Sequence, residues 1–191
     1  MFIAPYGTTT LSIKTKIMKA CMVYLLFFLG LSSQPSFANE ASSQVLPRKE
    51  DYPAPPVYKG KPAKLSLDSE LARTFRTRLT AALSQKPVYA GEYVLTGWGC
   101  GSSGCYDQVL VNKRTGKVLD MVFNAYSSYD VNDESDIRVG EWIESPKIDS
   151  RLLTTIKVEN SQDGKNFIYY TNYYIVDKNQ LTLIKTIQDS K

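Results

Sequence analysis

Residues 152–187, LLTTIKVENSQDGKNFIYYTNYYIVDKNQLTLIKTI, contain three strand-like segments separated by two short turns. β-Branched and aromatic side chains favour strands, and we place these strands at 152–159, 167–177 and 181–187. The intervening residues Ser161-Gln-Asp-Gly164 and Lys178-Asn179 are typical of tight hairpin turns. Because short turns join antiparallel neighbours, the stretch predicts a three-stranded antiparallel sheet.

The same pattern of strands and turns continues back along the chain to Pro87. We expect further strands at 88–98, 106–112, 117–125 and 137–145. Between two of them, Lys113-Arg-Thr-Gly116 predicts another hairpin, since glycine adopts a positive φ easily. The sequence therefore predicts an antiparallel sheet of six to seven strands.

One amphipathic helix is expected before the strands. Its apolar side chains recur every four residues, at Leu67, Leu71, Phe75, Leu79 and Leu83. Ser66 or Asp68 can cap its N-terminus, and Pro87 ends it. A helix of about 19 residues is about 28 Å long, enough to cover such a sheet. We predict an α+β fold with this helix packed on the sheet.

The first 38 residues have the features of a secretory signal peptide. Met18 and Lys19 precede an apolar run over residues 22–31, and Ser36-Phe-Ala38 is a small-x-small cleavage site. We place the start of translation at Met18 and cleavage after Ala38; an uncleaved anchor is the alternative. The apolar run is too short for a membrane span, so we expect a periplasmic or secreted protein.

Removal of residues 1–38 leaves a nearly neutral chain with two cysteines. The whole chain has 23 Lys and Arg against 19 Asp and Glu, and the segment holds three lysines and no acid, so 20 basic and 19 acidic residues remain. A net charge of +1 gives no reason to expect a nucleic-acid partner. In an oxidising compartment, Cys100 and Cys105 are expected to form a disulfide.

The remaining chain has two regions of different composition. Residues 39–63 contain five prolines and predict an extended arm, which either lies against the domain through Tyr52 and Tyr58 or is mobile. Residues 64–191 have the length of a single globular domain.

The chain contains no histidine. This excludes Ser–His and Cys–His nucleophile pairs, an imidazole general base and histidine-containing zinc sites. We therefore assign no catalytic residue, metal or cofactor, and we favour a protein that is not an enzyme.

The most unusual local sequence is Gly97-Trp-Gly-Cys-Gly-Ser-Ser-Gly-Cys105. Its glycines fit the G-x-G-x-x-G spacing of dinucleotide-binding loops, but a strand follows where that motif needs a helix. A rigid loop closed by the disulfide is the better interpretation, and it is either structural or a binding surface. The residues assigned to that surface are Trp98, Gly99, Gly101, Ser102, Ser103 and Gly104.

The strand at 167–176 carries aromatic side chains on both faces. Tyr169 and Tyr173 point to one face, and Tyr170 and Tyr174 point to the other. Either the strand is covered on both faces, or one tyrosine row is exposed for recognition, a role that suits tyrosine.

Two other patterns bear on metal binding and hydrolysis. The acidic loop 130–136 resembles a calcium loop, but Ser135 stands where such a loop needs glycine, so a solvated hairpin connection is favoured. Glycoside hydrolysis needs a pair of carboxylates, which strand positions alone do not establish. The candidates for such a pair are Glu92, Asp107, Asp120 and Glu141.

Several segments resemble a group of small exported bacterial proteins of unassigned function that is marked by a W-G-C-G segment. In order, they are Gly91–Gly101, a cysteine shortly after, 113–118, 149–153, paired tyrosines and 181–184. The resemblance spans roughly residues 70–187, although the loop before the second cysteine is longer than in that group. It implies export and a compact β-rich domain, and it identifies no catalytic residue.

We expect an exported, non-enzymatic binding protein, of the inhibitor or immunity type, that acts on an envelope enzyme. Trp98, the loop 99–104 and one tyrosine row would contact another envelope or secreted protein. One alternative is a carboxylate-dependent hydrolase of cell-wall or glycan material. Another is an envelope module that binds a lipid or a saccharide.

Overall fold

The computed structural model describes residues 45–102, 104–119 and 121–189, which belong to one compact unit. The expected signal peptide at 1–38 lies outside the described residues, as do Ser103 and Asp120. None of the helices in these described ranges has the length and hydropathy of a transmembrane span.

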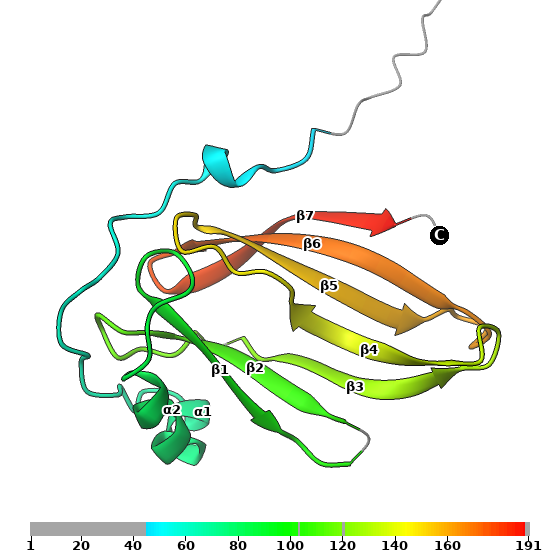
Figure 1. Ribbon diagram of the computed structural model, residues 1–191, viewed down its shortest axis with the longest axis horizontal. Coiled ribbons are helices and arrows are strands. Elements are labelled where there is room, and N and C mark those ends of the chain that lie inside the picture. The colour runs from blue at the N-terminus through cyan, green and yellow to red at the C-terminus, as the bar shows by residue number, and fades with distance from the viewer. Residues whose placement is uncertain (1–44, 103, 120, 190–191) are drawn as a thin grey trace, which may run out of the picture. The chain divides into compact units, whose positions relative to one another are not determined.

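Seven strands form one antiparallel sheet, in which each strand pairs with the next along the chain (Figure 1). They are β1 (Tyr93–Gly99), β2 (Tyr106–Asn112), β3 (Phe123–Asp130), β4 (Ser135–Ile143), β5 (Leu152–Asn160), β6 (Phe167–Asp177) and β7 (Gln180–Asp189). The predicted α+β fold with an antiparallel sheet of six to seven strands is confirmed.

The predicted hairpin turns are present because their residues tolerate positive φ angles. Gly116 after β2 has φ +75°, and Gly164 between β5 and β6 has φ +69°. Lys178 and Asn179 join β6 to β7 with φ angles of 46° and 64°, as in a type I′ turn.

Two strands begin later than the sequence predicts. The segment expected to be extended from residue 88 enters β1 only at Tyr93, because Ala90 and Gly91 have positive φ angles that interrupt a strand. After the 113–116 turn, Val118 forms only an isolated bridge with Val111, and the continuous strand β3 starts at Phe123.

Two short helices, α1 (Glu70–Thr74) and α2 (Arg76–Ala82), replace the single long helix that we predicted. Phe75 separates them, with φ −103° and ψ 25°. The N-cap is Ser69, whose side chain accepts a hydrogen bond from the Ala72 N–H at 3.1 Å, instead of Ser66 or Asp68. Four residues of the predicted apolar stripe, Leu71, Phe75, Leu79 and Leu83, pack in the core, whereas Leu67 is 40% exposed. The helices lie beside β1 without covering the whole sheet (Figure 1).

The two faces of the sheet carry separate core clusters. On the outer face, Trp98, Val109 and Val111 pack against the helices. On the inner face, side chains from every strand meet, among them Tyr93, Leu110, Phe123, Ile143, Leu153, Tyr174 and, at the margin, Leu181. Because β1 and β7 both contribute to the inner cluster, the sheet curls around it.

The described part of the predicted arm, together with the residues that follow it up to Ser66, lies along the rest of the domain. Four backbone N–H groups of this 45–66 segment donate to carbonyls at 2.8–3.0 Å: Ala54 to Asp149, Tyr58 to Gly91, Ala63 to Lys113 and Ser66 to Gly116. The Arg114 guanidinium also lies 4.6 Å from the centre of the Tyr58 ring. The arm therefore contributes backbone and aromatic contacts to the fold.

Candidate functional site

The loop between β1 and β2 is exposed and closed by a disulfide. Cys100 and Cys105 are bonded, with their Cα atoms 5.2 Å apart, as predicted. The Cys100 N–H also donates to the Cys105 carbonyl at 3.1 Å. Gly99, Gly101, Ser102 and Gly104 are exposed. The described part of this loop therefore offers backbone and small side chains to solvent.

Contacts with β3 fix the loop in place. The Asn124 amide nitrogen lies 3.1 Å from Cys100 Sγ and 3.3 Å from Cys105 Sγ, and it donates to Asp107 Oδ1 at 2.7 Å. A Cβ atom on Gly104 would lie 2.7 Å from Ser127 Oγ, so the loop backbone approaches β3 closely. The loop is thus ordered by covalent, polar and steric restraints together.

One exposed tyrosine that no local pattern of the sequence distinguishes adjoins this loop. Tyr106 directly follows Cys105 and is 46% exposed. Tyr126 is 39% exposed, but it points to the opposite face of the sheet, because Tyr106 pairs with Ala125, the neighbour of Tyr126 in β3. We call the exposed residues 99–102 and 104, together with Tyr106, the loop surface.

Trp98 lies beneath this loop in the core. Its side chain is 5% exposed and stacks on Phe75, with 3.9 Å between the ring centres. It shares the outer-face cluster with Leu79 and Val109. Trp98 therefore offers almost no surface to a partner.

The β6 tyrosines lie on two faces, as the alternation of a strand requires, but away from the loop. Tyr169, Tyr170 and Tyr173 are half-buried, and Tyr174 is buried in the inner cluster. Strands β4 and β5 separate β6 from β3 in the sheet. The structure does not bring a β6 tyrosine row and the loop into one continuous strand surface.

A polar network surrounds Glu141 on the inner face. Glu141 Oε1 accepts hydrogen bonds from Thr155 Oγ1, from Asn172 Nδ2 at 3.0 Å and from the Tyr174 hydroxyl at 2.8 Å. Asn172 Oδ1 in turn accepts from Thr186 Oγ1 at 2.7 Å. Burial, followed by the hydrogen bond to Glu141, raises the pKa of the Tyr174 hydroxyl. The network therefore links β4 to β7.

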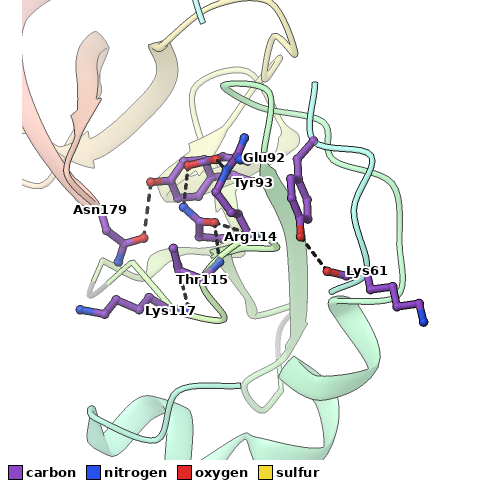
Figure 2. Close-up of polar contacts among 9 residues, drawn as sticks. Lys61, Glu92, Tyr93, Arg114, Thr115, Lys117 and Asn179 are labelled. Atoms are coloured by element: carbon purple, nitrogen blue, oxygen red, sulfur yellow. Dashed lines mark hydrogen bonds and ion pairs between the residues drawn. The ribbon is translucent and has the colours of Figure 1, made fainter. Parts of the chain in front are cut away.

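The other candidate carboxylates have structural partners. Glu92 accepts from Asn112 Nδ2 at 2.8 Å and pairs with Arg114 Nε at 2.6 Å (Figure 2). Asp107 accepts from Asn124, as described above. These contacts tie the turn after β2 and the loop to neighbouring strands, whereas Glu141 gathers three side-chain donors on one oxygen.

The acidic loop forms the turn between β3 and β4. Asp130 is buried, and its Oδ1 accepts from the Asn132 N–H at 2.9 Å, a local turn contact. Among the described residues, no three metal-ligating side chains gather at one point.

A comparison of the chain with protein families, curated proteins and solved structures finds no match. Function is therefore inferred from geometry. The loop surface and the Glu141 network are the two features that folding alone explains least well.

Proposed function

We propose that this protein is an exported binding protein, not an enzyme, whose loop surface contacts another envelope or secreted protein. The carrying observation is that the loop is exposed and yet held by a disulfide and by β3. A loop ordered in advance loses little conformational entropy on binding. Tyr106 adds aromatic contact area with few rotamers to restrict.

An inhibitor or immunity protein of an envelope enzyme is the class that this surface suits best. In enzyme–inhibitor complexes the interface backbone moves little on binding, which requires a pre-ordered loop. Glycines at 99 and 101 leave room for a partner to approach the loop backbone closely. The disulfide is compatible with an oxidising compartment outside the cytoplasm, where we place both proteins.

The proposal is tested by capture from the compartment in which the protein functions. The protein purified from its native location is immobilised and exposed to envelope and secreted fractions, and bound proteins are quantified by mass spectrometry. We expect a partner that the Tyr106→Ala variant retains about tenfold less, since aromatic anchors carry much of an interface's energy. If the partner is an enzyme, stoichiometric addition of the protein lowers its turnover.

Val57→Ala is the matched control, because Val57 is an exposed apolar residue of the arm, 44% accessible. This variant is expected to retain the partner as well as the native protein does. Equal retention by all three proteins, or no specific partner at all, would refute a role for the loop surface.

A further inference from the structure

The Glu141 carboxylate is held by three hydrogen bonds, more than the stability of the fold requires. Its three hydrogen-bond donors are themselves buried, since Thr155 is fully buried, Asn172 is 4% exposed and Tyr174 is 6% exposed. Among the described residues, no lysine or arginine forms an ion pair with Glu141. Apolar side chains of similar volume commonly stabilise a core as well as buried polar networks do. The network therefore points to a role besides stability.

The second carboxylate oxygen of Glu141 remains available to a ligand. All three described hydrogen bonds to this side chain end on Oε1. No buried side-chain oxygen in the described part of the chain lacks a partner, so Oε2 reaches solvent. The inner face opens along β5, from Leu153 and Thr155, which are fully buried, to Lys157, whose side chain is 40% exposed. Glu141 lies where the closed core meets this open part.

A row of four different side chains crosses the sheet at this point. Glu141 pairs with Lys157, Lys157 with Tyr170, and Tyr170 with Gln188, on strands β4 to β7. Lys157 Nζ lies 5.5 Å from the centre of the Tyr170 ring and 2.6 Å from Glu159 Oε2. These positions bring together a carboxylate that leans toward Thr155 and Asn172, an ammonium that pairs with Glu159, an aromatic ring and an amide. At the usual spacing of strands it spans about 14 Å.

We propose that this row is a binding site for a saccharide. Sugar hydroxyls both donate and accept, so they satisfy the carboxylate, the ammonium and the amide, while the Tyr170 ring covers the apolar face of the sugar. Lys157 would repel a cationic ligand, and Glu141 and Glu159 would repel an anionic one, so a neutral ligand is favoured. The length of the row suits an oligosaccharide better than a single sugar. This site is separate from the loop surface and does not depend on it.

The test is a titration of the exported protein with two neutral probes, triacetylchitotriose and maltotriose, followed by two-dimensional NMR. We expect at least one probe to bind with a Kd of about 5 mM or tighter. The largest shifts should fall on the amides of residues 141, 157, 170 and 188. Glu141→Gln keeps the shape of the side chain but replaces one carboxylate oxygen with an amide donor. It should weaken binding about tenfold, as expected for a lost hydrogen bond to a charged group.

Matched variants separate binding from folding. Glu50→Gln removes an exposed charge outside this site, and it should leave the affinity within about threefold. Gln188→Ala, at an exposed position, should weaken binding without changing the thermal unfolding temperature. The Tyr106→Ala variant should bind the sugar normally, so failure of the saccharide site and failure of the loop surface are distinguishable. Absence of binding by both sugars, or equal binding by native protein and Glu141→Gln, overturns the proposal.

Discussion

Replacement of Trp98 by alanine tests whether this side chain serves the core or a contact surface. Trp98 is 5% exposed and stacks on Phe75 with 3.9 Å between ring centres. A buried aromatic side chain removes about 150–250 Å² from water, which at about 25 cal/mol/Å² corresponds to about 4–6 kcal/mol. Measured Trp→Ala losses in cores are about 3–5 kcal/mol. We expect the free energy of unfolding to fall by about 4 kcal/mol.

The assay is equilibrium urea unfolding, followed by circular dichroism and by the fluorescence of Trp142, the other tryptophan of the chain. With an m-value of about 2 kcal/mol/M, the midpoint should fall by about 2 M. Tyr129→Ala is the control, because Tyr129 is 55% exposed, and its loss should be within about 0.5 kcal/mol. If Trp98→Ala lowered the free energy of unfolding by less than about 1 kcal/mol and yet abolished capture of a partner, the assignment of Trp98 to the core would be wrong.

Three further outcomes follow from the structure. In the double variant Cys100→Ser/Cys105→Ser, the free energy of unfolding measured in urea should fall by about 2 kcal/mol, the chain-entropy value for a six-residue loop. An unchanged free energy of unfolding would mean that the disulfide does not restrain the unfolded chain. Gly116→Ala should lower the free energy of unfolding by more than about 1 kcal/mol, because φ is +75° and a Cβ would collide with a carbonyl of the 45–66 segment. An unchanged melting temperature would contradict that contact. Burial raises the pKa of Tyr89 and Tyr174 in the folded protein. As the pH rises above 10, these two hydroxyls therefore ionise in the unfolded chain before they ionise in the folded one. Their contribution to stability is complete below pH 10, and above it stability should fall by up to about 1.4 kcal/mol per pH unit for each tyrosine, with a shallower slope for Tyr174→Phe.

The turns of the sheet were predictable because local residues determine them. Gly116, Gly164 and the Lys178-Asn179 pair adopt positive φ angles in the hairpins that the sequence predicted. The interruption at residues 90–91 was not predictable in the same way. There the Ala90 N–H donates to the Lys147 carbonyl and the Gly91 N–H donates to the Ile148 carbonyl, at 3.1 and 2.7 Å. These partners are more than fifty residues away, so no local pattern encodes them.

The break between the helices has a similar origin. Apolar spacing correctly identified the face that Leu79 and Leu83 bury, and it suggested one continuous helix through Phe75. In the structure, Phe75 leaves helical geometry where its ring stacks on Trp98, a residue of β1. Side-chain periodicity reports which face is buried, but it does not report where a tertiary contact bends the backbone.

Glu141 illustrates what strand register adds to a sequence. Alternation alone places Asn172 and Tyr174 on one face of β6, and it leaves four carboxylates as equal candidates. Only the pairing of β4 with β5 and of β5 with β6 brings Glu141 next to those two donors. A shift of one residue in either pairing would turn its carboxylate to the opposite face.

The aromatic residues on both faces of β6 follow from the curl of the sheet. A flat sheet with one solvated face would need polar residues at every second position of this strand. In the curled sheet, the inner face of β6 passes from the closed core at Tyr174 to the more open position of Tyr170, while Tyr169 and Tyr173 remain half-buried on the outer face. The tyrosine hydroxyl suits both environments, since that of Tyr174 donates to Glu141 in the core and that of Tyr170, at the open end, helps to lower the pKa of the Glu159 carboxyl through a hydrogen bond. One strand can therefore serve both packing and the proposed saccharide site without a change of residue type.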